Sequence, residues 1–298
     1  MTATARSSAP SLPGRILVTG HTGFIGRHLT ARLESLSVTV AGFSRSTSGD
    51  LLEHDLPLEG AGHVFHLAGL SYVPDSWADP AGIYRVNTEG TVRVLDQCRR
   101  AGVPLTFIST FVYGAGAPVP VPETFPPVPA NPYAFSKLAA EEACRFFART
   151  FDMDVTVLRL FNAYGPGQSD SFLIPTIVRQ AANPDVAEIV LADLEPRRDF
   201  IHVSDVVEAM IRTIGLPGGG TYNIGSGRSH SIGEVIAACL KATGVSKPYR
   251  GRGERRENEV MDVVADISAF TAATGWRPQM GLEAGMQTVI DSVRPSGT

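Results

Sequence analysis

The sequence has little cysteine, little charge imbalance and no long hydrophobic run. Its cysteines, Cys98, Cys144 and Cys239, are scattered and form no CxxC pair, which favours reduced, buried thiols in a cytoplasmic protein over a disulfide framework. A net charge of −4 gives no electrostatic basis for binding nucleic acid or an anionic membrane. The apolar runs are too short to span a bilayer, and no group of His, Cys and Asp has metal-ligand spacing. These absences predict a soluble protein without a metal, nucleic-acid or membrane partner.

A chain of 298 residues is long enough for one large domain or two. Its apolar stretches recur regularly along the chain. Apolar stretches at 15–20, 38–43, 63–69, 104–110, 154–162 and 221–225 read as strands, several of them apolar on both faces. Segments with helical periodicity, such as 24–35 and 137–150, separate them. This alternation predicts an α/β fold with a doubly wound parallel sheet.

After about Gly165 the alternation becomes less regular. Residues 171–183 read as a helix, and a capping box of Ser231 and Glu234 predicts the start of another. We expect these segments to form a smaller mixed lobe over the carboxyl edge of the sheet, where such folds bind ligands. The predicted division is a flexible tail at 1–13, a dinucleotide-binding domain at 14–165 completed by segments near 198–225, and a mainly substrate-binding lobe at 166–298.

A glycine-rich loop, TGHTGFIG, follows the first predicted strand and opens the first predicted helix. Gly20, Gly23 and Gly26 have GxxGxxG spacing, which allows a tight turn, close approach of the backbone to a pyrophosphate, and close packing of helix on strand. The helix N-terminus also attracts phosphate. The position of the loop favours dinucleotide binding over a glycine-rich turn without a ligand.

The end of the second predicted strand bears on which nicotinamide dinucleotide binds. A carboxylate there would bind the ribose 2′-hydroxyl of NAD, whereas an arginine would accommodate the 2′-phosphate of NADP. The stretch AGFSRSTSGD has no acid at the strand end and offers Ser44 and Arg45 instead. We therefore favour NADP (NADPH) over NAD, with a solvated loop arginine as the alternative.

Tyr133 and Lys137 stand four residues apart behind a proline, in NPYAFSK. On a helix they share a face, so the Lys137 ammonium can approach the Tyr133 phenol and lower its pKa from the ordinary value of about 10. The same spacing occurs by chance in many helices. By itself it does not separate a proton-transfer pair from an ordinary helix start.

Several longer motifs, in order along the chain, add to this pair. They are the glycine loop, HLAG at 66–69, STFVYG at 109–114, YAFSK at 133–137, LRLFNAYGPG at 158–167, RRDFIHVSDV at 197–206 and YNIGSG at 222–227. With them the chain resembles an extended short-chain dehydrogenase/reductase over nearly its whole length, and more narrowly the nucleotide-sugar epimerase/dehydratase/reductase group. The resemblance implies a Rossmann fold, a GDP-, dTDP- or UDP-linked sugar substrate, and a homodimer.

The resemblance also assigns roles to residues. Tyr133 would be the general acid/base, Lys137 would lower its pKa and hold the nicotinamide ribose, and Ser109 would hydrogen-bond the oxygen at the reacting carbon. The cofactor would contact Gly20, Gly23, Phe24, Ile25, Gly26, Ser44, Arg45, Asp55, Leu56, Leu67, Ala68, Gly69, Asn87, Tyr133 and Lys137. The nucleotide sugar would contact Ser71, Tyr72, Ser109, Asn162, Arg198 and Arg256. The two arginines would clamp the diphosphate, with a surface charge as the alternative for each.

Two positions of STFVYG separate the activities of the group. The 4,6-dehydratases have an Asp-Glu pair where this chain has Thr110 and Phe111, and the epimerase-reductases that invert next to a ketone have a cysteine at the position of Phe111. We therefore expect NADPH-dependent reduction of a nucleotide-linked 4-keto-6-deoxyhexose, most like that of GDP-6-deoxy-4-keto-mannose (lyxo-4-hexulose) reductases. The alternative is a nucleotide-sugar 4-epimerase with tightly bound NAD. A remote alternative is a non-catalytic NADP-binding sensor.

Overall fold

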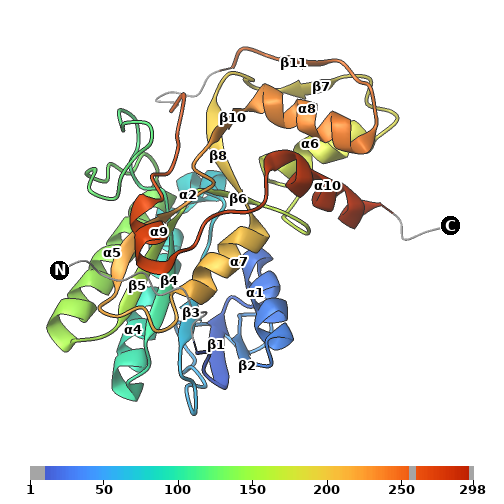
Figure 1. Ribbon diagram of the computed structural model, residues 1–298. Coiled ribbons are helices and arrows are strands. Elements are labelled where there is room, and N and C mark those ends of the chain that lie inside the picture. The colour runs from blue at the N-terminus through green and yellow to red at the C-terminus, as the bar shows by residue number, and fades with distance from the viewer. Residues whose placement is uncertain (1–10, 255–259, 295–298) are drawn as a thin grey trace.

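A six-stranded parallel sheet forms the centre of the computed structural model, which describes residues 11–254 and 260–294 (Figure 1). Its strands are β1 (Arg15–Thr19), β2 (Thr39–Phe43), β3 (Val64–His66), β4 (Leu105–Thr110), β5 (Val155–Leu160) and β9 (Gly220–Ile224). They lie in the order β2-β1-β3-β4-β5-β9, and every neighbouring pair is parallel. The six apolar stretches of the sequence are therefore confirmed as the strands of one sheet.

Helices cover both faces of this sheet (Figure 1). On one face lie α1 (Phe24–Ser35), α7 (Val203–Arg212) and α9 (Ser268–Thr274), and on the other lie α4 (Gly90–Ala101) and α5 (Pro132–Phe151). Successive side chains of β1 alternate between the two layers: Ile16 and Val18 pack with the first, and Leu17 packs with the second. The predicted doubly wound, Rossmann-like sheet is thus confirmed.

The order of the strands reverses between β1 and β3, because β2 lies on one side of β1 and the later strands lie on the other. In doubly wound sheets the crevice beyond the carboxyl ends of two such strands is the ligand site. The glycine loop leaves β1 at this point, and residues 67–70 leave β3 beside it. After β3 the chain runs through α2 (Val73–Ala78), α3 (Pro80–Tyr84) and the π-helix η1 (Arg85–Glu89) into α4.

A smaller lobe, in the upper part of Figure 1, contains a three-stranded and a two-stranded sheet. In one sheet β8 (Arg197–His202) lies between the antiparallel β10 (Ser229–Ser231) and the parallel β6 (Asn162–Tyr164). A second pair joins β7 (Ile189–Leu191) and β11 (Tyr249–Gly251). The helices α6 (Leu173–Ala182), α8 (Ile232–Thr243) and α10 (Leu282–Val293) share a buried apolar cluster. This confirms the predicted mixed lobe, and α8 begins with the predicted capping box of Ser231 and Glu234. The domain boundaries stay a prediction, and residues 1–10 of the predicted tail lie outside the described residues.

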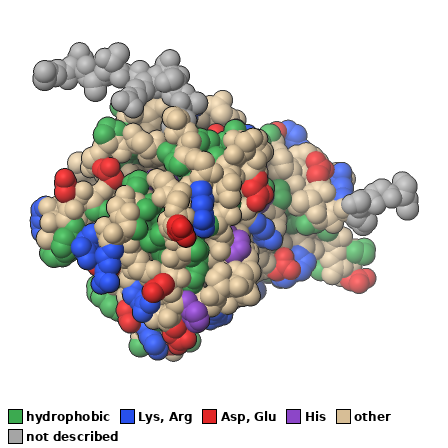
Figure 2. Space-filling view, turned by 90° about the horizontal axis from the view of Figure 1, so that it is seen from below, with side chains coloured by type: hydrophobic (Ala, Val, Ile, Leu, Met, Phe, Trp, Pro, Cys, Tyr) green, Lys and Arg blue, Asp and Glu red, His purple; other side chains and the backbone are tan. Residues whose placement is uncertain are grey.

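The surface and the interior agree with the balanced composition. On the face drawn in Figure 2, Lys and Arg side chains are interspersed with Asp and Glu rather than gathered into one area of a single sign. All three cysteines are free and buried. Within 11–254 and 260–294, no helix is both long and apolar enough to cross a membrane.

Candidate active site

The tyrosine–lysine pair occupies the first two turns of α5. The Asn131 side chain caps the helix by accepting a hydrogen bond of 2.8 Å from the Ala134 N–H, and Pro132 takes the first helical position. Lys137 is buried, with Nζ 4.3 Å from the ring centre of Phe107 in β4. Tyr133 stands one turn before Lys137, on the same face of this helix.

Burial sets the protonation of both groups. It lowers the pKa of Lys137 to about 8, although nearby Cys144 and Glu141 act in the opposite direction. Burial also raises the pKa of Tyr133 to about 12, and an interaction with Thr110 offsets part of that rise. Lys137 is not among the causes of this shift, so the lowering of the Tyr133 pKa by Lys137 stays a prediction.

Ser109 lies close to this pair, but its hydroxyl is engaged by a buried ion pair. Its Oγ donates to Glu141 Oε1 over 2.6 Å. Glu141, fully buried on α5, also accepts hydrogen bonds from Arg159 of β5, with Arg159 Nη2 2.7 Å from Oε2. Arg159 in turn donates to the Tyr113 hydroxyl over 3.0 Å. The role of Ser109 at the reacting oxygen stays a prediction.

The glycine loop leaves space that any side chain would fill. Gly20 has φ +73°, and a Cβ there would lie 2.8 Å from the Ala68 nitrogen. A Cβ on Gly26 would lie 2.1 Å from the Gly20 oxygen. Gly23 is the N-cap of α1 and offers no side chain to cap the first turn, which begins with Phe24 and Ile25. The free N–H groups and the positive end of the helix dipole fit a dinucleotide pyrophosphate.

The two residues of the predicted 2′-phosphate site lie at the end of β2 and differ in exposure. Ser44 is buried, and its hydroxyl lies 2.9 Å from that of Thr47. Arg45 is exposed and makes no hydrogen bond or ion pair within the part of the chain that the structure describes. Its guanidinium is therefore available to an anionic ligand.

Asp55 and Leu56, predicted near the adenine, follow this strand at a greater distance along the chain. The Asp55 carboxylate is exposed and lies 3.4 Å from Arg93. Leu56 is buried, and its N–H donates to Gln97 on α4 over 2.7 Å. The structure thus fixes the backbone of Leu56, and leaves the Asp55 side chain on the surface.

The loop after β3 joins the cofactor crevice to the catalytic helix. Leu67 and Ala68 lie beside the end of β1, where the Ala68 N–H donates to Thr19 Oγ1 over 3.2 Å. Buried Asn87 accepts from the Leu70 N–H over 2.8 Å and donates to Ser136 Oγ over 2.9 Å. A Cβ on Gly69 would lie 4.0 Å from Lys137 Nζ. These contacts bring Gly69, Asn87 and Lys137 together at the carboxyl ends of β3 and β4.

The residues predicted to bind the nucleotide sugar belong to two regions. The Asn162 side chain on β6 donates to the backbone carbonyl oxygen of Asp199 on β8 over 3.2 Å. Arg198, which precedes Asp199 on β8, donates to the backbone carbonyl oxygen of Val260 over 2.6 Å. Exposed Ser71 and the N-cap Tyr72 precede α2, and the Tyr72 ring meets Phe172 of the second lobe edge-on, with 6.1 Å between ring centres. Arg256 lies outside the described residues.

Sequence reasoning missed Glu141 and Arg159, although a signal for both was present. Glu141 lies one turn beyond Lys137 on the same face of the helix, and Arg159 interrupts an otherwise apolar buried strand. A charge in such a strand requires a buried partner of opposite sign.

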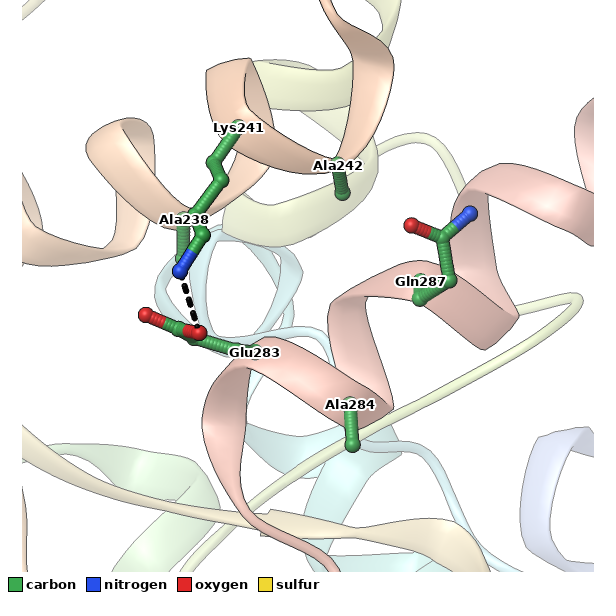
Figure 3. Close-up of a pocket in the computed structure, with 6 residues that line it drawn as sticks. All are labelled: Ala238, Lys241, Ala242, Glu283, Ala284 and Gln287. Carbon is green, nitrogen blue, oxygen red and sulfur yellow. Dashed lines mark hydrogen bonds and ion pairs between the residues drawn. The ribbon is translucent and has the colours of Figure 1, made fainter.

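A hollow of about 320 Å³ between α8 and α10 is separate from this site. It is lined by Ala238, Lys241, Ala242, Glu283, Ala284 and Gln287 (Figure 3). Lys241 Nζ lies 2.7 Å from Glu283 Oε2 across it, so its two charges neutralise each other. The hollow contains none of the residues discussed above, and we assign the chemistry to the crevice around Tyr133.

Known proteins resemble this chain over nearly its whole length. Residues 16–225 match the NAD dependent epimerase/dehydratase family. The GDP-6-deoxy-D-mannose reductase of Pseudomonas aeruginosa is 34% identical, with 93% of this chain and 96% of that protein covered. The UDP-glucose 4-epimerase of Mycolicibacterium smegmatis is 30% identical, with 94% and 98% covered.

Solved structures also resemble this chain over nearly its whole length. RMD from Pseudomonas aeruginosa complexed with NADPH has a TM-score of 0.86 at 34% identity, with 94% of this chain and 98% of that chain covered. The UDP-glucose 4-epimerase of Thermus thermophilus in complex with NAD has a TM-score of 0.83 at 28% identity, with 95% and 100% covered. Both nicotinamide dinucleotides therefore occur among similar structures.

Proposed function

Because the chain belongs to the NAD-dependent epimerase/dehydratase family, we propose that it reduces a nucleotide-linked 4-keto-6-deoxyhexose to the nucleotide 6-deoxyhexose with NADPH. One observation carries the direction: Arg45 is exposed at the end of β2, where the sequence has no acid, and it fits the 2′-phosphate of the NADPH that a reductase consumes. Burial raises the pKa of Tyr133 to about 12, so the phenol carries a proton at neutral pH and can act as the donor that carbonyl reduction needs.

The residues of the crevice divide the reaction between them. NADPH, when bound, supplies the hydride that goes to the carbonyl carbon. Tyr133 gives its proton to the carbonyl oxygen, so the C=O becomes CH–OH and a phenolate remains. Lys137, protonated below about pH 8, stabilises that phenolate. Phe111, packed against Phe161 with ring centres 5.7 Å apart, adds no second acid or base.

The cofactor preference rests on the end of β2. The exposed Arg45 guanidinium would pair with a 2′-phosphate, and the Ser44 hydroxyl would accompany it. The loop from Gly20 to Gly26 would hold the pyrophosphate on the N-terminus of α1. The NADPH complex of the Pseudomonas aeruginosa protein supports this preference, and the NAD complex of the Thermus thermophilus epimerase supports the alternative.

The substrate diphosphate would lie over β6 and β8. Asn162 and Arg198 stand on these adjacent strands, and an amide and a guanidinium are donors suited to phosphate oxygens. Arg256 is the second predicted clamp. The reductase relative supports a GDP-linked sugar, and the epimerase relative supports a UDP-linked one.

A panel of GDP-, dTDP- and UDP-linked 4-keto-6-deoxyhexoses tests the proposal, with NADPH absorbance as the readout. We expect stoichiometric oxidation of NADPH with at least one of these substrates, by protein that carries little bound NAD after purification. Protein that is purified with NAD and interconverts UDP-glucose and UDP-galactose, without net redox change, would identify the 4-epimerase instead.

A further inference from the structure

Two phenylalanines stand side by side just beyond the carboxyl edge of the main sheet. The strands β4 and β5 end at Thr110 and Leu160, which are partners in the register. The pairing continues one step further, because the Phe111 N–H donates to the Leu160 oxygen over 3.1 Å. The Phe111 and Phe161 ring centres lie 5.7 Å apart, with 30° between the ring planes. Phe161 is buried and Phe111 is partly exposed, so Phe111 is the ring that a ligand can reach.

This pair belongs to an apolar cluster. The other buried members are Tyr113, Val121, Val263 and Ala265. Phe125 packs against them, with its ring centre 6.4 Å from that of Tyr113. The polar atom among these side chains is the Tyr113 hydroxyl, which donates to Asn223 over 2.6 Å and accepts from Arg159 over 3.0 Å. A ligand that reaches Phe111 therefore meets an apolar surface whose one hydroxyl already has partners.

The pair lies between two parts of the proposed substrate site. Phe111 follows Ser109 by two residues, and Phe161 directly precedes Asn162. Ser109 is proposed to bind the carbonyl oxygen together with Tyr133, and Asn162 is proposed to bind the diphosphate. A nucleotide sugar that reaches from one to the other would place the carbons next to its carbonyl against the Phe111 ring.

We propose that Phe111 contacts the C6 methyl group of the 4-keto-6-deoxyhexose and selects against the same sugar with a C6 hydroxyl. C6 is bonded to C5, the ring carbon next to the C4 carbonyl, so it lies within reach of a side chain beside Ser109. A methyl group against the ring is removed from water, which is favourable. A hydroxyl would lose its hydrogen bonds to water there and gain no partner. The inference rests on the proposed function for the position of the carbonyl.

Binding of two matched pairs of nucleotide sugars tests this assignment without turnover. GDP-6-deoxymannose and GDP-mannose differ only in the C6 hydroxyl, as do UDP-6-deoxyglucose and UDP-glucose. Each is titrated calorimetrically into protein saturated with NADPH, which cannot reduce an alcohol. We expect the wild type to bind the 6-deoxy member of at least one pair roughly ten-fold more tightly, within the range for rejection of an added hydroxyl by an apolar site.

Three variants separate contact with the sugar from a general loosening of the cluster. Phe111→Ser makes room and supplies a hydroxyl, so we expect the ratio of the two affinities to fall roughly five-fold or more. Phe111→Leu keeps an apolar side chain and should keep most of the ratio. Phe125→Ser makes the same substitution at a partly buried phenylalanine of the same cluster, on the loop between β4 and α5. It should lower the melting temperature and leave the ratio unchanged.

The binding ratio and the reduction assay can fail separately. A ratio that favours the 6-deoxy sugar and is lost in Phe111→Ser would support the inference even if no ketosugar is reduced, and the proposed function would then fail alone. Equal wild-type affinities for both members of each pair would overturn the inference. An unchanged ratio in Phe111→Ser, or an equal loss in Phe125→Ser, would also overturn it, while oxidation of NADPH by a ketosugar would still support the proposed function.

Discussion

Tyr133 is the side chain on which the proposed chemistry depends most directly. Tyr133→Phe removes the transferable proton with little change in packing, because the two side chains differ only in the hydroxyl. We expect turnover to fall roughly 100-fold or more, the range of a positioned general acid, while NADPH affinity stays near that of the wild type. Steady-state kinetics and a fluorescence titration with NADPH measure the two quantities. Near-normal turnover would remove Tyr133 from the mechanism.

Arg45 is the side chain on which the cofactor preference depends. Arg45→Asp removes a cation from the expected 2′-phosphate and adds a carboxylate that can accept from a ribose 2′-hydroxyl. We expect the ratio of kcat/KM for NADPH to that for NADH to fall at least ten-fold, or about 1.4 kcal/mol. Arg149→Asp, at the exposed end of α5, makes the same change in net charge far from β2 and should leave the ratio unchanged. An unchanged ratio in Arg45→Asp would assign that arginine to solvent.

At the scale of the residue, the sequence predicted that Tyr133 and Lys137 share a helix face, but it did not predict the pKa values of their side chains. The spacing of Tyr133 and Lys137 placed both on one face of a helix, as observed. Their pKa values depend on how far Phe107 and the rest of the second layer exclude water, which no local spacing encodes. The direction of the Ser109 hydroxyl likewise depends on Glu141, which is 32 positions away in the sequence.

A buried histidine between β3 and β4 leads to a prediction about how the stability of the fold depends on pH. His63 precedes β3, is buried, and has Nε2 2.9 Å from Thr106 Oγ1 on β4. Burial lowers its pKa from the ordinary value of 6.5 to about 3, so between these values the unfolded chain binds a proton that the folded chain does not. The stability contributed by neutral His63 is therefore present above about pH 6.5 and is lost as the pH falls below it.

His63→Leu should reduce this pH dependence. At about 1.4 kcal/mol per pH unit, the fall in the free energy of unfolding between pH 7 and pH 5 should be smaller by up to about 2 kcal/mol than in the wild type. Urea denaturation at the two pH values measures the difference. His54→Gln, at an exposed histidine, serves as the control and should behave like the wild type. If both variants behave alike, the His63 ring is reached by water and can be charged in the folded state.

The elements that the sequence predicted are those that lie in a longer apolar or periodic stretch or that begin with a capping motif. Each strand of the six-stranded sheet is an apolar stretch, and the capping box located the start of α8. The short strands β6, β7, β10 and β11 were not predicted. Their pairing depends on distant partners, as where Asn162 lies opposite Phe200.

At the scale of the molecule, α4 and α5 present apolar side chains that the described part of the chain leaves uncovered. The two helices lie together on the outer side of the sheet (Figure 1). Phe135 and Phe146 stand three turns apart on the face of α5 opposite the sheet, and Val92 is exposed on α4. The Phe135 ring stacks on exposed Tyr84 with 6.1 Å between ring centres. Exposed apolar side chains gathered on one face of a helix pair can mark a protein–protein contact.

We propose that a second copy of the chain covers this face, as in an isologous dimer in which α4 and α5 of each copy pack against those of the other. The occupant is a second copy because the family resemblance implies a homodimer, and because a two-fold axis lets the same aromatic residues meet themselves. Phe146→Glu would place two buried carboxylates across that axis, whereas in a monomer the side chain is 48% exposed and tolerates the change.

We expect the wild-type protein to have twice the chain mass of 31.7 kDa in light scattering coupled to gel filtration, and Phe146→Glu to have the mass of one chain. Tyr249→Glu serves as the control, since Tyr249 is similarly exposed but lies on β11 in the other lobe. Circular dichroism should show all three proteins folded, because none of these changes enters a buried core. The crevice around Tyr133 is built from one chain, so the monomeric variant should keep most of its NADPH affinity. A wild-type protein that is monomeric at all concentrations, or a Phe146→Glu variant that remains dimeric, would assign the α4–α5 face to solvent or the contact to another surface.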